Sequence, residues 1–146
     1  MATRVETTDR TLVLWWNGSP TGDDVKLASS SLAALRSSSG REPYYISVVW
    51  AGSRPPDDSG REAFLALTDE VLERCAEFHV VLDCNPFVKA IARGLIAASG
   101  VVRKYPGKVL VHDSLDQALM AVYEHTQEQH LLTIEMPELE DAPQSA

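Results

Sequence analysis

One serine is placed where another molecule could modify or recognise it. Residues 57–60 (DDSG) separate a β-branched and aromatic run at residues 44–50 from a stretch with apolar side chains at helical spacing, residues 60–76. Ser59 and Glu62 have the spacing of a capping box, which predicts that Ser59 is the N-cap of this helix. A hydroxyl there is exposed at the positive end of the helix dipole, where a phosphate group would be stabilised.

Ser59 has two interpretations. In the structural one, the residue only caps the helix, and its loss would cost about 0.5–2 kcal/mol of stability. In the regulatory one, phosphorylation would add roughly −1.5 to −2 charges beside Asp57 and Asp58. Such a phosphate would weaken the binding of an acidic partner and strengthen the binding of an arginine-rich one.

Strands and helices are predicted to alternate on both sides of this turn. The expected strands cover residues 11–16, 44–50, 78–83 and 108–112. The expected helices cover residues 21–36, with Thr21 at its start and Asp24 three residues on, and residues 60–76, 86–98 and 115–124. That order implies a largely parallel sheet whose crossover helices cover its faces. We therefore predict a single α/β domain with four or five strands in a largely parallel or mixed sheet and about four helices.

The two ends of the chain differ in character from the middle. Residues 1–10 are polar apart from Val5 and are expected to be either an edge strand or a disordered arm. We place the domain at residues 11–127 and an acidic C-terminal tail at residues 128–146. Within the tail, the apolar patch at residues 131–136 (LLTIEM) could fold back on the sheet or dock to another protein.

The composition is that of a soluble domain. Its 146 residues suffice for one domain, and 45% hydrophobic and 23% charged residues indicate neither disorder nor a membrane span. Thirteen basic and 21 acidic residues give a net charge of −8, which argues against binding to nucleic acid. Cys75 and Cys84 form no Cys-x-x-Cys pair, and residues 1–10 contain no apolar signal core, so we expect reduced thiols and a cytoplasmic location.

Three other groups of residues have side chains that could bind a ligand or react. Trp15 and Trp16 are strand neighbours, so they point to opposite faces and are expected in the core, whereas Trp50 is the tryptophan expected to line a surface groove. Cys84 precedes a helix start, but no base can be assigned to it. The histidines lack metal-ligand spacing; they are His79, His112, His125 and His130. With no nucleophile elbow or phosphate-binding loop in the sequence either, we expect no metal, no cofactor and no catalytic residues.

Residues 11–124 resemble the STAS domain, the fold of bacterial anti-sigma-factor antagonists. Three motifs occur in the order of the family: the strand at residues 46–50 followed by Asp57-Asp58-Ser59-Gly60, the strand at residues 78–83 followed by Asn85-Pro86-Phe87-Val88, and the strand at residues 109–112 followed by the segment DSLDQAL. The resemblance places Ser59 on the serine that such antagonists present to a kinase. Asp58 departs from the pattern, because the family has a hydroxyl there, and Pro55-Pro56 lengthens the preceding loop.

The resemblance implies a non-enzymatic interaction module. Its protein partner would be an anti-sigma factor or a serine-kinase-like regulator, and self-association is also open. The residues expected to bind the partner are Asp57, Asp58, Ser59, Gly60, Asn85 and Phe87.

The alternative is a small-molecule or lipid-binding domain, similar to the divergent STAS and Sec14-type proteins. Its pocket would lie between the sheet and two helices, at the carboxyl ends of the strands, and would be lined by Trp50, Phe64 and Val88. A flat surface with an exposed Ser59 would favour the interaction module. An apolar cavity of several hundred Å³ would favour the ligand-binding domain.

Overall fold

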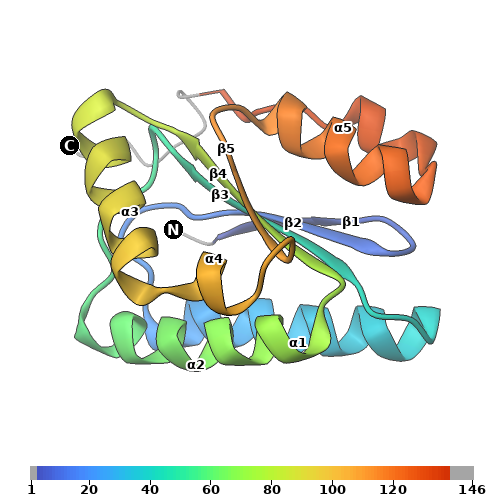
Figure 1. The fold of residues 1–146 in the computed structure, drawn as a ribbon, viewed down its shortest axis with the longest axis horizontal. Coiled ribbons are helices and arrows are strands. Elements are labelled where there is room, and N and C mark those ends of the chain that lie inside the picture. The colour runs from blue at the N-terminus through green and yellow to red at the C-terminus, as the bar shows by residue number, and fades with distance from the viewer. Residues whose placement is uncertain (1–2, 139–146) are drawn as a thin grey trace.

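Five strands form one mixed sheet in the computed structural model, which describes residues 3–138 (Figure 1). They lie side by side in chain order: β1 (Arg4–Thr7), β2 (Thr11–Trp15), β3 (Tyr44–Trp50), β4 (Glu77–Asp83) and β5 (Val109–His112). β1 is antiparallel to β2, and each later pair of neighbours is parallel. The predicted α/β fold with a mixed, largely parallel sheet is confirmed.

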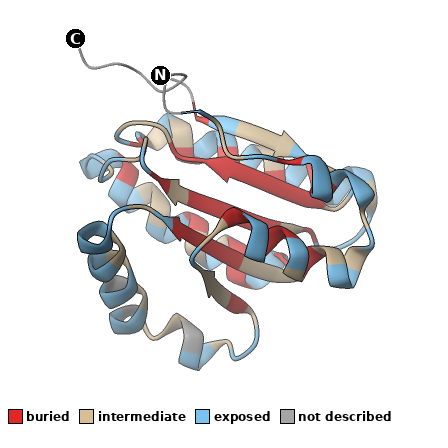
Figure 2. Cartoon of the chain, turned by 90° about the horizontal axis from the view of Figure 1, so that it is seen from above, coloured by how far each residue is buried: buried red, intermediate tan, exposed pale blue. Residues whose placement is uncertain are grey.

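The helices cover the sheet unequally. α1 (Gly22–Ser39) and α2 (Asp58–Arg74) lie on one face, and α5 (Leu115–Thr126) with the short 3-10 helix η1 (Gln129–Thr133) lies on the other (Figure 1). α3 (Pro86–Ser99) and the single turn α4 (Val101–Lys104) connect β4 to β5 at the end of the sheet. Figure 2 shows the central strands buried and α3 exposed along most of its length. α3 is therefore the helix least integrated into the domain.

The core has two parts, one on each face of the sheet. Alternate residues of β2 supply them: Leu12 and Leu14 face α1 and α2, whereas Val13 and Trp15 face α5. Trp16 lies on the α1 and α2 side, so the two neighbouring tryptophans pack under different helices, as predicted. No helix within residues 3–138 is long and apolar enough to cross a membrane.

Most predicted helix starts are confirmed, but helix ends differ from the prediction: α2 ends at Arg74 instead of residue 76, and α1 is longer than expected. Thr21 caps α1 in a capping box with Asp24, and Asn85 and Ser114 cap α3 and α5. α1 continues through Ser39 instead of ending near residue 36. The serines at positions 37–39 are part of the helix. The helix ends at Gly40, whose backbone adopts the left-handed conformation with φ 68°.

Both ends of the described chain belong to the folded unit. Residues before position 11 form the edge strand β1, and the segment after α5 folds back, with Leu131 fully buried and Ile134 only 4% exposed. The carboxylate of Glu128 accepts hydrogen bonds from the Arg10 N–H at 3.1 Å and from the Thr11 hydroxyl at 2.8 Å. The apolar patch at residues 131–136 (LLTIEM) therefore folds back, with Leu131 and Ile134 in the core. Residues 139–146 of the predicted tail lie outside the described part of the chain.

A pair of histidines that the sequence did not connect lies on β4 and β5. His79 is fully buried, and its Nδ1 lies 2.8 Å from Nε2 of His112, while its Nε2 lies 2.9 Å from a carboxylate oxygen of Glu77. The carboxylate can only accept, so His79 donates from Nε2 and accepts at Nδ1 from His112. On the far side of Glu77, His125 approaches the second carboxylate oxygen at 3.7 Å. Burial lowers the pKa of both His79 and His112, so both rings are neutral in the folded protein.

This pair predicts a loss of stability in mild acid. A histidine whose folded pKa lies below its ordinary value near 6.5 is neutral in the folded state but takes up a proton once unfolded. The free energy of unfolding should therefore fall as the pH drops from 7.5 to 5.5. Urea unfolding at several pH values measures this slope. His79→Gln should flatten it, whereas His130→Gln, at a histidine that is 55% exposed, should leave it unchanged. An equal slope in all three proteins would contradict the prediction.

Candidate functional site

Two loops at the carboxyl edge of the sheet are hydrogen-bonded to each other. The loop after β2 and the loop after β3 exchange backbone bonds: Gly18 N–H to Gly52 O at 2.9 Å, Arg54 N–H to Gly18 O at 2.9 Å, and Asp57 N–H to Pro20 O at 3.2 Å. This ladder extends the parallel pairing of β2 with β3 beyond the strands. As a consequence, the first residues of α1 and α2 are held next to each other.

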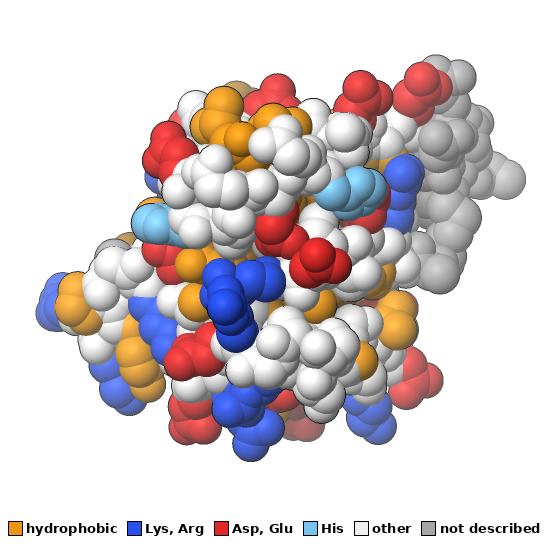
Figure 3. All heavy atoms as spheres, turned by 90° about the vertical axis from the view of Figure 1, so that its right-hand side faces the viewer, with side chains coloured by type: hydrophobic (Ala, Val, Ile, Leu, Met, Phe, Trp, Pro, Cys, Tyr) orange, Lys and Arg blue, Asp and Glu red, His pale blue; other side chains and the backbone are white. Residues whose placement is uncertain are grey.

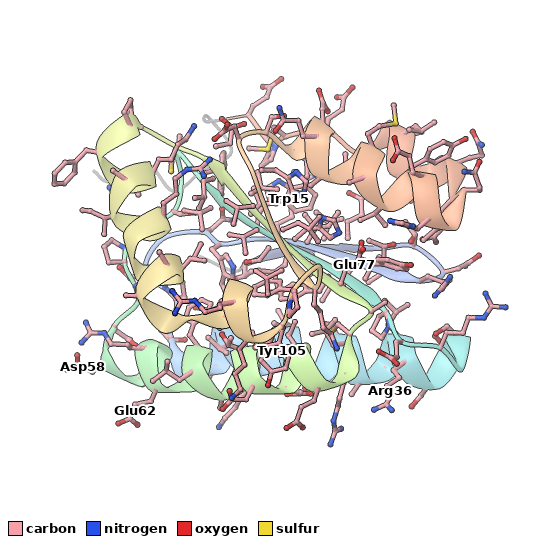
Figure 4. The ribbon with its side chains drawn as sticks, in the orientation of Figure 1. Trp15, Arg36, Asp58, Glu62, Glu77 and Tyr105 are labelled. Atoms are coloured by element: carbon pink, nitrogen blue, oxygen red, sulfur yellow. The ribbon has the colours of Figure 1, made fainter. Side chains whose placement is uncertain are left out.

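Asp57, and not Ser59, is the N-cap of α2. Its Oδ1 accepts hydrogen bonds from the Gly60 N–H at 2.7 Å and from the Ser59 hydroxyl at 2.8 Å, and these bonds hold the pKa of the carboxyl below its ordinary value. The predicted capping box of Ser59 with Glu62 is therefore wrong by two residues. In Figure 4, Glu62 and Asp58 extend from the start of α2 away from the sheet.

Ser59 is exposed, but its hydroxyl is bonded on both sides within the chain. It donates to Asp57 and accepts the Gly22 N–H at 3.1 Å, which is one of the free donors at the start of α1. Ser59 therefore ties the N-termini of two helices together. The neighbouring Asp58 has a fully exposed side chain, which forms a weak ion pair of 3.8 Å with Arg61.

Gly60 is required because the start of α2 lies very close to the backbone at Pro20. A Cβ atom at this position would lie 2.1 Å from the carbonyl oxygen of Pro20, far inside van der Waals contact. The obstacle is backbone that the loop ladder holds in place, so it cannot move aside as a flexible side chain could. Of the four residues in the predicted motif, Asp57, Ser59 and Gly60 thus maintain the junction of α1 with α2.

An apolar groove lies next to this junction. Its cavity of about 550 Å³ is bounded by the carboxyl ends of the central strands, the loop before α2, and α3. Trp16, Trp50 and Phe64 contribute aromatic surface, and Val88, Ile91 and Ala92 of α3 form the facing wall. The two helices on either side of it, α2 and α3, diverge in Figure 1, and α3 stands at a steep angle across the end of the sheet. The three residues predicted to line a pocket, Trp50, Phe64 and Val88, all lie in this groove.

The aromatic side chains turn their apolar surface to the groove. The indole N–H of Trp16 donates to the Ser47 hydroxyl at 2.8 Å, and that of Trp50 donates to the Trp16 carbonyl at 3.0 Å. Phe64 packs edge-to-face on Trp16, with 4.5 Å between the ring centroids. Because both indole donors are used, these rings offer carbon surface and no hydrogen bond to an occupant.

The groove opens where α3 begins. The Asn85 side chain accepts the Val88 N–H at 2.9 Å and so caps α3, and Phe87 projects from the first turn with 75% of its surface exposed. Val88 and Ile91 are 39% and 49% exposed. Asn85 and Phe87, predicted as partner-binding residues, therefore lie on the groove and apart from the junction residues Asp57, Ser59 and Gly60.

Cys84 lies in the groove wall but is not an activated nucleophile. Burial raises the pKa of its thiol, so the neutral form dominates at physiological pH. Both cysteines are free, and Cys75 is buried beneath α2. Within the described residues, no three histidine, cysteine or carboxylate side chains are gathered as metal ligands.

The opposite end of the molecule has a different surface. Figure 3 shows acidic and basic side chains interspersed there, with hydrophobic side chains only in small, separate patches. At the groove end, by contrast, the exposed apolar side chains Phe87, Val88 and Ile91 lie together along one cavity.

The sequence missed several groove residues. Trp16 was expected in the core, where it is 2% exposed, yet its edge lines the cavity together with Arg54, Pro55 and Ile91. The signal available for Trp16 was its place at the end of a strand, at the same edge of the sheet as Trp50. For Arg54 and Pro55 the signal was their place in the loop that follows the central strand.

Comparison with known proteins adds no relative. A scan against protein-family models finds no model that matches the chain, and a search of curated proteins finds no match either.

The junction predicts opposite effects for two glycine-to-alanine substitutions in helices. Gly60→Ala should destabilise the protein by about 1–3 kcal/mol, because the new methyl group overlaps the Pro20 carbonyl. Gly94→Ala, in the middle of α3 with no neighbouring atom within 4 Å of the new Cβ, should stabilise it by up to about 1 kcal/mol through helix propensity. Urea unfolding of both variants checks this. A Gly60→Ala protein as stable as the wild type would contradict the close contact.

Proposed function

We propose that this protein is a non-enzymatic binding domain that holds a small apolar molecule in the groove between the sheet, α2 and α3. The observation that supports this most is the cavity of about 550 Å³ with aromatic and aliphatic walls. Its volume falls within the roughly 300–1,000 Å³ typical of ligand sites. Its position at the carboxyl ends of parallel strands is also the usual place for ligands in open α/β sheets.

The exposed side chains of α3 supply a driving force for binding. Phe87, Val88 and Ile91 are between 39% and 75% exposed, and covering apolar surface gains about 25 cal/mol per Å². α3 also contacts the sheet mainly through β4, so it can adjust its distance from α2 around an occupant. A ligand that fills the groove would complete the packing that α3 lacks.

The polar groups beside the groove support a binding role over a catalytic one. The Ser47 hydroxyl accepts from Trp16, the Ser53 hydroxyl donates to the Trp16 carbonyl at 2.6 Å, and the Cys84 thiol is neutral. These hydrogen bonds, and that of the Trp50 N–H to Ser53, join the two serines to tryptophans and not to a histidine or a carboxylate, and burial together with the charge of Asp83 raises the pKa of the Cys84 thiol. A nucleophile, a base and a residue to orient the base are therefore not assembled here.

We also propose that the chain is a divergent STAS-like domain. The three motifs in family order and the mixed α/β sheet support this assignment. The groove favours the ligand-binding branch of that resemblance.

The binding function predicts that blocking the groove abolishes uptake of a neutral apolar dye. Nile red should bind the wild type saturably, seen as increased fluorescence. Ala92→Trp, which places a bulky ring in the cavity wall, should weaken binding by about tenfold or more, equivalent to at least about 1.4 kcal/mol. Ala90→Trp, on an exposed part of α3 outside the cavity lining, should bind as the wild type does. Absence of saturable binding, or an equal loss in both variants, would contradict the proposal.

A second candidate function is a regulated protein interaction at the Ser59 turn. The observation in its favour is that Ser59 and Asp58 are exposed beside the groove, so a kinase or a regulatory partner could reach them. A phosphate on Ser59 would remove the hydroxyl donor to Asp57 and set a second negative charge beside that carboxylate, which would loosen the start of α2 even though phosphate oxygens can still accept the Gly22 N–H.

This second function predicts phosphate on Ser59. Mass spectrometry of the protein purified from its native cells should then find a phosphorylated fraction of the peptide that contains residues 57–60. A peptide that is entirely unmodified under all growth conditions sampled would contradict the regulatory role. It would leave Ser59 as a structural tie.

A further inference from the structure

We infer that the occupant of the groove is an anionic amphiphile, an apolar chain that ends in a carboxylate, and that Arg54 binds its head group. This inference rests on the proposed binding function. Two observations support it: Arg54 is the charged residue in the described cavity lining, and hydrogen bonds of the loop ladder fix its backbone.

Arg54 is the only charged residue among those described that line the cavity. The chain as a whole has a net charge of −8, so a cation at the mouth of its apolar groove runs against the general charge of the surface. An anionic head group is the complement of that cation, whereas a cationic one would be repelled by it.

The guanidinium of Arg54 is exposed and has no ion-pair partner among the residues that the structure describes. Other cations near this end of the protein are already paired: Lys89 and Arg93 both contact Asp113, at 3.3 and 2.7 Å, and Arg61 contacts Asp58. Within residues 3–138 the side chain of Arg54 makes no ion pair. Its five N–H donors can meet a carboxylate through two parallel hydrogen bonds.

The backbone holds Arg54 in place. Its N–H donates to the Gly18 carbonyl at 2.9 Å, within the ladder that joins the two loops, and Pro55 and Pro56 follow it with restricted backbone angles. A side chain on such a segment starts from a fixed point at the rim. Less backbone entropy is therefore lost when a head group binds.

The polarity of the cavity fixes the orientation of the ligand. The interior offers aromatic and aliphatic surface, and the indole donors of Trp16 and Trp50 are used within the chain. A ligand with polar groups along its length would lose hydrogen bonds to water without replacement. A ligand with an apolar body and one terminal carboxylate would place each part against matching groups.

Decanoate and decanol test this inference because they share an apolar chain and differ in the charge of the head. Each is titrated, below its aggregation threshold, against the protein loaded with Nile red. The wild type should bind decanoate about tenfold more tightly than decanol, as expected for a charge-assisted hydrogen-bonded pair. Arg54→Gln should lose this preference and keep its affinity for decanol. Arg61→Gln removes the same charge outside the cavity lining and should behave as the wild type.

The outcomes separate the head-group inference from the binding function. Equal affinity of the wild type for decanoate and decanol, or a preference that survives Arg54→Gln, would overturn the role of Arg54 while the groove remains a binding site. Failure of Nile red and of both ligands to bind would instead overturn the binding function itself. Thermal unfolding of the two arginine variants should match the wild type, because neither side chain contributes to the core.

Discussion

The junction between the N-termini of α1 and α2 is the constraint on which the groove end of this protein depends. Two loops that follow neighbouring parallel strands are joined by backbone hydrogen bonds, and Ser59 links the start of α2 to the first N–H of α1. At Gly60 the start of α2 lies closer to the Pro20 carbonyl than a residue with a Cβ atom at position 60 would allow. Because α2 starts from this fixed point, one wall of the groove is rigid.

The other wall of the groove is held by much weaker packing. α3 follows β4, is capped by Asn85, and contacts the sheet mainly through β4, and its side chains Phe87, Val88 and Ile91 are partly exposed. A wall with Trp16 and Phe64, held by the junction, thus faces a helix that has fewer contacts with the rest of the domain. That combination suits a site that closes around a ligand better than a site that performs a reaction, which would need fixed groups on both sides.

Much of the fold could be predicted from the sequence because its signals are local. Apolar spacing identified four of the five strands and all four long helices, and the caps Thr21, Asn85 and Ser114 marked helix starts. Residues 57–59 were harder, since all three are good N-cap residues and local pattern cannot choose among them. The choice of Asp57 follows from the position of Pro20, which is distant in sequence.

The remaining features depend on contacts between distant segments. Glu128 reaches Arg10 and Thr11 across more than a hundred residues, so no local pattern could show that the segment after α5 joins the core. The contact of His79 with His112 follows from the register of β4 and β5. The groove follows from the angle of α3, which its amphipathic sequence does not specify. For that reason Trp50, Phe64 and Val88 could be proposed as pocket residues, whereas the place of Arg54 in the cavity lining could not.

The most direct test of the groove as the binding site is a titration of the ¹⁵N-labelled protein with decanoate, followed by the indole N–H signals of its three tryptophans. Trp16 and Trp50 line the cavity, whereas Trp15 is fully buried beneath α5 and does not line it. The indole signals of Trp16 and Trp50 should shift and saturate together with the backbone signals of α3, while that of Trp15 stays in place. Saturable shifts confined to other surfaces, with Trp16, Trp50 and α3 unchanged, would contradict the account.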